Sequence, residues 1–396
     1  MTPVHHPTAP RREPVPPVLW ILTAGAFTVG TDAYVIAGVL PDLARDLGVT
    51  VGAAGQLVTV FAAVYALAAP VVASSTAALS RRGALSAALA AFVAGNALTA
   101  AAPGYWLVML GRVVAAVGAA GFTPAASAAA ADLVAPRHRA RALAAVVGGL
   151  TAATALGVPL GTLVAGALGW RATLGAVAVL GLVALAGTAA RLPALPPGAR
   201  LPLARRLAGL RNPAVLLVLA VSLFTVTSEQ LVYTYVGTAL APATGDRAGV
   251  LAVLLFVFGL GAVVGNAVAG WGTDRFGSRV TLLVAVGGMT ADLALLPWWC
   301  RSLPAAGAAM FWWGLTGWMY VVPQQHRLLV LARPGGPLAV ALNSSVLYLG
   351  IALGGALGGA VLHFAAPSRL AVPAVLLGAL ALVTAATGYR EAPRAT

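Results

Sequence analysis

Charged residues are scarce in this chain. They make up 9% of its 396 residues, while 60% are hydrophobic. A typical soluble domain carries about 25% charged residues, and it has no way to bury so large an apolar fraction. A lipid bilayer is itself an apolar solvent and removes that difficulty. The composition therefore excludes an ordinary soluble fold and favours a protein with many membrane spans.

Lysine is absent, and there is a single cysteine, Cys300. All 24 basic residues are arginines, which contribute to a net charge of +14. They are scattered through the short polar breaks between apolar stretches, whereas a nucleic-acid surface would gather them in one patch. One cysteine excludes an internal disulfide, and no spacing of Cys and His is typical of a metal site. We therefore expect no nucleic-acid partner, no metal ion and no cofactor.

Long apolar stretches are abundant instead. Roughly 20 apolar residues are enough to cross a bilayer as a helix, and an open strand edge in lipid would leave backbone groups unpaired. We predict an all-α membrane protein with twelve transmembrane helices, at 17–40, 53–75, 83–102, 105–130, 139–167, 170–190, 213–240, 247–270, 278–298, 303–332, 337–364 and 368–389.

The arginines predict how these spans are oriented. If the N-terminus is cytoplasmic, 17 arginines fall on the cytoplasmic side and 5 on the other, with Arg112 and Arg327 assigned within helices. Cytoplasmic loops carry such an excess, and an even number of spans returns the C-terminus to the same side. We expect a monomeric, multi-pass protein of the inner (plasma) membrane with both termini cytoplasmic.

A polar, Pro-rich break divides the chain into two halves. The expected domains are a disordered cytoplasmic tail at 1–16, an N-terminal six-helix bundle at 17–190, a cytoplasmic linker at 191–212, a C-terminal six-helix bundle at 213–390 and a cytoplasmic tail at 391–396.

The two halves repeat each other at an offset of 197 positions. Phe27-Thr-Val-Gly-Thr-Asp32 returns as Phe224-Thr-Val-Thr-Ser-Glu229. At the same offset Gly157-Val-Pro-Leu-Gly161 falls on Gly354-Gly-Ala-Leu-Gly358, and Thr76 and Arg82 fall on Thr273 and Arg279. Parallel repeats of this kind place a substrate site between the units, near the middle of the membrane.

Three carboxyl groups are predicted deep within spans: Asp32, Glu229 and Asp292. An ionised carboxylate in hydrocarbon costs about 2.5–3.5 kcal/mol or more, so it faces water, pairs or takes up a proton. Asp32 and Glu229 are equivalent in the repeats, and we expect both to face a central cavity as proton-coupling residues. The alternative is a pair of structural carboxyls. For Asp292 we expect a structural hydrogen bond.

Several neighbouring side chains are candidates for the cavity wall. Thr28 and Thr225 precede the two equivalent carboxyls by four residues, and Tyr233 follows Glu229 by four, so each shares a helix face with its carboxyl. The other candidates for substrate contact are Tyr34, Asn343 and Trp313, the last from the aromatic run at 311–320.

Arg112 is predicted inside the fourth span, where it must pair with a carboxylate or reach water. Asp32 is the expected partner, and the alternative is that the side chain extends to the membrane interface. Arg112 then counts with the two carboxyls as a proton-coupling candidate.

Two motifs are candidates for conformational control. Gly270-Trp-Gly-Thr-Asp274-Arg275-Phe-Gly277-Ser-Arg279 is predicted on the cytoplasmic side between two spans. There Asp274 is expected to pair with or cap a neighbouring helix while Arg275 and Arg279 anchor the loop. The second motif places Pro159 between Gly157 and Gly161, where it should kink its helix.

These stretches resemble the major facilitator superfamily across nearly the whole chain. The loop from Asp274 to Arg279 resembles the family's cytoplasmic loop motif, although the first-half copy has Ala77 where the acidic residue is expected. Gly111-Arg112-Val-Val-Ala-Ala-Val-Gly118 resembles the fourth-span arginine motif, and Gly157-Val-Pro159-Leu-Gly161-Thr resembles the fifth-span antiporter motif.

Two further stretches narrow the resemblance to one branch. The segment from Thr31-Asp32 through Gly38-Val-Leu-Pro41 to Gly48 is similar to the first-span motif of twelve-span drug:proton antiporters. Leu342-Asn343-Ser344-Ser345 is similar to the eleventh span of the arabinose-efflux and chloramphenicol-resistance branch. The resemblance implies two pseudo-symmetric six-helix bundles, proton transfer at Arg112 and transport in the direction of export.

The leading hypothesis is therefore proton-coupled export of a small drug-like molecule or secondary metabolite. Efflux of a sugar or similar metabolite is the near alternative, which Asn96, Gln230, Gln324, Gln325 and Asn343 keep open. A membrane-embedded enzyme would need a nucleophile and a base at suitable spacing, and neither His326 nor His363 provides one. A transport-inactive sensor would not need charges at the two equivalent carboxyls.

Overall fold

A computed structural model describes residues 17–193, 195, 202–332 and 335–388, and within them every regular element is helical. The expected tails at 1–16 and 391–396, and positions 194 and 196–201 of the expected linker, lie outside the described residues.

The first half consists of α1 (Pro17–Asp46), α2 (Val51–Ser75), η1 (Thr76–Ala78), α3 (Arg81–Ala101), α4 (Tyr105–Asp132), η2 (Pro136–His138), α5 (Arg139–Ala152), the π-helical turn η3 (Ala153–Gly157), α6 (Val158–Leu168) and α7 (Trp170–Arg191). The short helices α8 (Leu203–Arg206) and η4 (Ala208–Arg211) follow.

The second half consists of α9 (Pro213–Tyr233), α10 (Val236–Ala239), α11 (Ala241–Thr244), α12 (Ala248–Ala294), α13 (Leu296–Trp299), α14 (Leu303–Met319), α15 (Val321–Leu331), α16 (Gly336–Phe364), η5 (Pro367–Leu370) and α17 (Ala371–Gly388).

The described helices provide the twelve spans predicted from the sequence. Ten stretches are long and apolar enough to cross a membrane. One of them, α12, has 47 residues, which at 1.5 Å per residue is about 70 Å, more than twice a bilayer core. It contains two spans, because the chain turns at Gly277. The shorter helices α14 and α15 follow each other directly and together form the remaining span.

The boundaries of the helices repeat at the same offset as the sequence. For example, α2 begins at Val51 and α12 at Ala248, while α7 ends at Arg191 and α17 at Gly388. Both pairs are 197 positions apart. The duplication therefore extends well beyond the short motifs that first revealed it.

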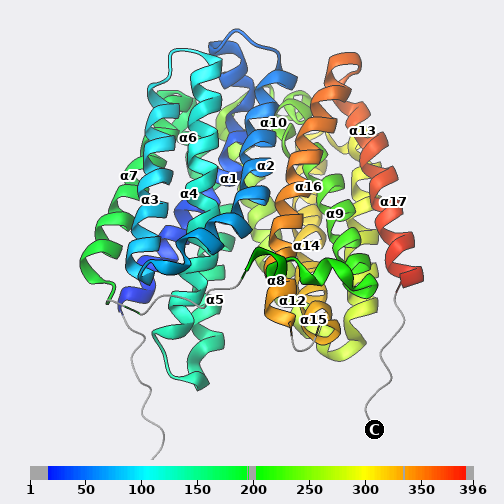
Figure 1. Cartoon of the computed structure of the whole chain (residues 1–396). Helices are drawn as coiled ribbons and strands as arrows, with labels where there is room; N and C mark the ends of the chain where they lie inside the picture. The colour runs from blue at the N-terminus through cyan, green and yellow to red at the C-terminus, as the bar shows by residue number, and fades with distance from the viewer. Residues whose placement is uncertain (1–16, 194, 196–201, 333–334, 389–396) are drawn as a thin grey trace, which may run out of the picture.

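The two sets of helices lie side by side, with α8 crossing between them at one end (Figure 1). The start of α1 and the end of α17 lie at that same end, which we call the linker face. Contacts between the halves are made mainly by α2 with α16, and by η3 and α6 with α12. At the linker face, Arg206 of α8 donates a hydrogen bond to the carbonyl of Ala73, with an Nη2–O distance of 3.1 Å.

The predicted disruption around Pro159 takes the form of a π-helical turn. Proline has no N–H to donate and its ring crowds the preceding turn, and a widened turn just before it is a known way to relieve this. Here η3 ends at Gly157, two residues before the proline. Gly157 faces Thr31 and Gly161 faces Val35, so the two glycines let this helix approach α1 closely.

Gly277 allows the tight turn between the two spans of α12. Its φ is 83° and its ψ is 159°, a region that is almost reserved for glycine. We expect Gly277→Ala to destabilise the protein by about 1–3 kcal/mol, the usual cost of such a conformation. Gly270→Ala is the matched control, because that glycine is helical and a methyl group there meets no atom within 4 Å. Thermal unfolding in detergent measures both, and equal effects would contradict the prediction.

Candidate functional site

Asp32 and Arg112 form an ion pair between α1 and α4. The distance from Arg112 Nη1 to Asp32 Oδ1 is 2.6 Å, and both side chains are 0% exposed. The same guanidinium lies over the ring of Phe61, 4.2 Å from its centroid. The predicted partner of Arg112 is therefore confirmed, and its extension to the membrane interface is excluded.

Not every polar atom of this pair is satisfied. The side chain of Asn96 lies within hydrogen-bonding reach of the Asp32 carboxyl, whereas Arg112 Nε and Asn96 Oδ1 have no hydrogen-bond partner among the described residues. Burying two charges is compensated only when their remaining polar atoms are also hydrogen-bonded. The pair is therefore neutral overall, although not every polar atom in it is hydrogen-bonded.

Glu229 on α9 has a different environment. It is 5% exposed, and within the described residues no ion pair or hydrogen bond of its carboxylate is found. On α14, Gly317 leaves space for it, because a methyl group there would lie 3.1 Å from Glu229 Oε1. The phenol groups of Tyr34, Tyr233 and Tyr320 are within electrostatic range. Glu229 is thus a lone carboxyl among aromatic side chains.

The side chain of Asp32 is completely buried, whereas that of Glu229 is 5% exposed. Tyr34 and Tyr348 lie deep inside the bundle, yet both side chains are partly exposed. Helix α1 is packed by helices of both halves, so the exposed part of Tyr34 faces the interior and not lipid. The ion pair with Arg112 distinguishes Asp32 from Glu229, and the expectation that both carboxyls face a central cavity remains a prediction.

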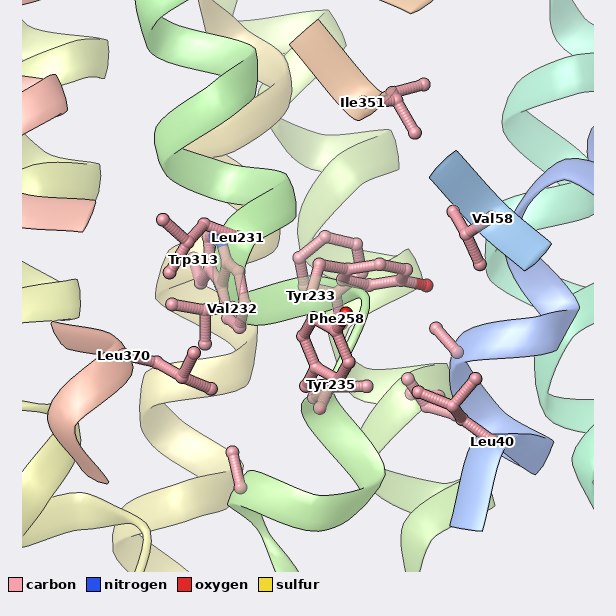
Figure 2. Close-up of a cluster of buried hydrophobic side chains, with 14 of the residues drawn as sticks. Leu40, Val58, Leu231, Val232, Tyr233, Tyr235, Phe258, Trp313, Ile351 and Leu370 are labelled. Carbon is pink, nitrogen blue, oxygen red and sulfur yellow. The ribbon is translucent and has the colours of Figure 1, made fainter. Parts of the chain in front are cut away.

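Aromatic rings from both halves gather beside Glu229. The ring of Tyr233 lies edge-to-face with Tyr34 and with Trp313, at centroid distances of 5.9 and 6.0 Å, and Trp318 lies 6.5 Å from Tyr34. Phe258 of α12 contacts both Tyr233 and Trp313. Figure 2 shows Tyr233, Phe258 and Trp313 grouped within the second half. Three predicted wall residues, Tyr34, Tyr233 and Trp313, therefore belong to one cluster.

The predicted hydroxyl and amide residues differ in how far they are satisfied. Thr28 donates to the carbonyl of Ala24 in its own helix, at 2.9 Å. Thr225 Oγ1, Tyr233 OH and Asn343 Oδ1 are buried and have no partner among the described residues. Because an unpaired buried polar group costs about 1–3 kcal/mol, these three remain candidates for contact with a bound molecule.

The acidic loop motif at the linker face is anchored mainly by an arginine. Arg279 donates to the carbonyl of Ala386 on α17, with an Nη2–O distance of 3.0 Å. Asp274 is exposed, and within the described residues no ion pair involves it. In the first half, whose motif lacks the acid, Arg81 instead pairs with Asp132 at 3.2 Å. The cross-helix ion pair therefore occurs in the half where it was not expected.

Sequence reasoning missed a contact between the halves. Tyr65 of α2 and Tyr348 of α16 stack face to face, with ring centroids 3.5 Å apart and an interplanar angle of 14°. Tyr348 is also within electrostatic range of Asp32 and Tyr34. Nothing in the repeat signals this stack, since residues 151 and 262, at the equivalent positions, are threonine and alanine.

The expected hydrogen bond of Asp292 is absent from the described residues. Its Oδ2 is buried without a partner, while its backbone carbonyl accepts a hydrogen bond from Trp299 Nε1 at 2.9 Å. Among the described residues, no hydrogen bond or ion pair joins the carboxyl of Asp292 to Glu229. It remains a buried carboxyl outside the candidate site.

The halves meet most tightly away from the linker face. A methyl group on Gly52 of α2 would lie 2.9 Å from the carbonyl of Gly359 on α16, and one on Gly55 would overlap the hydroxyl group of Tyr235 in the second half. On the other side, Gly259 of α12 lies against the backbone of Ala155 in η3. A groove of about 620 Å³ lies beyond the first contact, between the start of α2 and the end of α16.

Comparison with known proteins points to one family. A model of the Major Facilitator Superfamily matches residues 22–335. The chain is 31% identical to the inner membrane transport protein YdhP of Escherichia coli (strain K12), over 95% of this chain and 96% of that protein. It is 33% identical to the MFS-type transporter YbcL of Bacillus subtilis (strain 168), over 86% and 87%. It is 36% identical to a chloramphenicol resistance protein of Streptomyces lividans, over 72% of each.

Proposed function

Because the chain belongs to the major facilitator superfamily, whose members are membrane transporters and not enzymes, we propose that it exports small drug-like molecules or secondary metabolites in exchange for protons. The observation that carries this proposal is Glu229, a buried carboxyl that has no cation partner among the described residues and lies beside aromatic side chains. A carboxyl that is alternately protonated and ionised is what proton coupling requires. The direction of transport rests on the resemblance of 157–162 to the antiporter motif.

The mechanism follows from the unequal environments of the two carboxyls. Glu229 binds a proton when it is open to the side of higher proton concentration, and it loses the proton when the halves rock to expose it to the other side. Asp32 keeps its charge balanced by Arg112 and holds α1 and α4 together through the cycle. Tyr34 of α1 lies within electrostatic range of Glu229 on α9. A change in the charge of Glu229 therefore changes its electrostatic interaction with a residue of the first half.

Export of an antibiotic is the specific form of the proposal. It is supported by similarity to the chloramphenicol resistance protein and by the aromatic wall of Tyr34, Tyr233 and Trp313, which suits an apolar molecule better than a sugar. The protein acts in the plasma membrane, with the linker face and both termini in the cytoplasm, as the distribution of arginines favours.

The test compares coupled and uncoupled transport in proteoliposomes. Glu229→Gln is expected to abolish accumulation driven by a pH gradient while retaining counterflow of labelled substrate, because exchange alone needs no proton. Before this assay, the substrate is identified by expressing the protein in an efflux-deficient bacterium and measuring resistance to a panel of compounds that includes chloramphenicol. Asp246→Asn is the matched control, since Asp246 is an exposed carboxyl without an ion pair among the described residues. Gradient-driven transport by Glu229→Gln at the wild-type rate would refute the coupling role.

A further inference from the structure

A groove lies on the outer surface of the second half, at the end of the bundle opposite the linker face. It has a volume of about 500 Å³ and is lined by α13, the last residue of α12 and the start of α17, whose other end is at the linker face (Figure 1). Its wall is mostly apolar, and Trp298, Val372 and Leu376 are 67%, 54% and 66% exposed there. In a protein that spans a membrane, such a surface contacts lipid chains, so the groove opens onto the bilayer.

An arginine and a tryptophan line this otherwise apolar groove. Arg369 and Ser368 lie beside its wall, and no lining residue is acidic. Among the described residues, the guanidinium of Arg369 has no ion pair or hydrogen bond. Tryptophan is enriched where the lipid headgroups begin, because its ring is apolar and its N–H is polar. The groove therefore combines a free positive charge with a surface for an acyl chain.

The first half closes the equivalent place with its own side chains. There Arg171 of α7 pairs with Asp46 of α1 and donates a hydrogen bond to the carbonyl of Ala102 after α3, with an Nη2–O distance of 3.0 Å. The residues 197 positions after Asp46 and Arg171 are Ala243 and Ser368. The second half therefore lacks both the acid and the arginine of this clamp, and its place between the corresponding helices is open.

A phosphate group matches what the second half lacks. Arg369 directly follows the position of the missing arginine, and a guanidinium binds phosphate through two parallel, charge-assisted hydrogen bonds. A phospholipid brings that phosphate together with an acyl chain for the apolar wall, whereas a soluble anion would leave the wall unused. A headgroup of net negative charge is favoured over a zwitterionic one, because the latter carries a cation of its own.

We propose that this groove binds an anionic phospholipid, with its phosphate on Arg369 and an acyl chain along Val372 and Leu376. The lipid then links the spans of the second half at the place where the first half uses Asp46 and Arg171. The inference goes beyond the proposed function and is independent of it, since it requires neither proton coupling nor a particular substrate.

The experiment measures which lipid lies beside Trp298. The full chain is reconstituted into mixed bilayers of phosphatidylglycerol and phosphatidylcholine, with one lipid at a time brominated on its chains, because bromine quenches nearby tryptophan fluorescence. The difference from Trp298→Phe isolates the signal of this ring. We expect phosphatidylglycerol to be preferred at least about fivefold, or about 1 kcal/mol, which is the attraction of one arginine for an anionic surface. Equal quenching by the two lipids would overturn the inference.

Two arginine variants separate the groove from the general charge of the protein. Arg369→Gln should lose the preference for phosphatidylglycerol, with Trp298→Phe again isolating the signal. Arg247→Gln is the matched control, because it removes one positive charge at the same end of the bundle. Arg247 does not line the groove, and its Nε donates to the carbonyl of Thr244 at 3.1 Å. Equal losses in both variants would show that the net positive charge attracts the lipid, and would refute the site.

Inorganic phosphate and thermal unfolding complete the test. Phosphate added at constant ionic strength should leave the lipid preference unchanged, and a preference abolished by phosphate would show a site for a soluble anion instead. In detergent, phosphatidylglycerol should raise the Tm of the wild type more than phosphatidylcholine does, and Arg369→Gln should remove that difference. Equal Tm values of the wild type with the two lipids would contradict the linking role.

Discussion

Replacing Arg112 by methionine while Asp32 remains is expected to destabilise the protein by about 3–5 kcal/mol, the usual cost of breaking a buried ion pair from one side. Both side chains are 0% exposed and 2.6 Å apart, so the remaining carboxylate would have neither water nor a counter-charge. It regains neutrality only by binding a proton, and the loss should therefore grow as the pH rises. Thermal unfolding in detergent, followed by size-exclusion chromatography at pH 6 and pH 8.5, measures it.

The double variant separates charge from packing. Asp32→Asn combined with Arg112→Met removes both charges, and a pair replaced on both sides usually costs little. We expect most of the stability to return and the pH dependence to disappear. If instead the stability lost in the double variant equals the sum of the losses in Asp32→Asn and in Arg112→Met, the two residues do not act as a pair. The assignment of Asp32 as a structural partner of Arg112 is then wrong.

Gly259→Val is expected to slow transport by about 5- to 150-fold. A side chain there would press on the backbone of Ala155, whose nitrogen would lie 2.9 Å from the added carbon. Overpacking of this kind costs about 1–3 kcal/mol, and here the cost falls on the state in which η3 and α12 are in contact. A shift of that size in the balance between two conformations corresponds to the stated range. The rate of substrate uptake into proteoliposomes measures it.

Gly249→Val is the control for that experiment. It lies on the same helix, and an added carbon there meets no atom within 4 Å, so transport should stay near the wild-type rate. Similar losses in both variants would mean that α12 is sensitive to any bulkier residue. A normal rate in Gly259→Val would show that the halves do not need this close approach during the cycle.

Much of the fold could be predicted from the sequence, because bilayer thickness and backbone hydrogen bonding leave few choices for apolar stretches of this length. The pairing of Asp32 with Arg112 was predictable for a related reason, since a buried arginine must find a carboxylate. Helix boundaries were less certain. The predicted break between the spans at 247–270 and 278–298 corresponds to the turn at Gly277, whereas no prediction placed a π-helical turn before Pro159.

The unequal environments of the two carboxyls were not predicted, although the sequence contains a difference that indicates them. Asp32 and Glu229 are equivalent in the repeat, which suggested equal environments. However, the position equivalent to Arg112 is Ala309, so the second half has no arginine at that position. A comparison of Arg112 with its equivalent residue, as well as of the two carboxyls, would have predicted that their environments differ.

The aromatic run in α14 shows what the sequence could not decide. Trp312 and Trp313 are adjacent, yet the first is 47% exposed and the second is fully buried beside Tyr233. The weak amphipathicity of an apolar helix gives no indication of which side faces lipid. Only packing against α9 and α12 determines which ring belongs to the candidate site.

The stack of Tyr65 on Tyr348 has a consequence for how the halves move. Two flat rings in parallel contact slide over each other more easily than they separate, because offset positions remain favourable. This geometry therefore allows α2 and α16 to slide past each other while the two rings stay in contact.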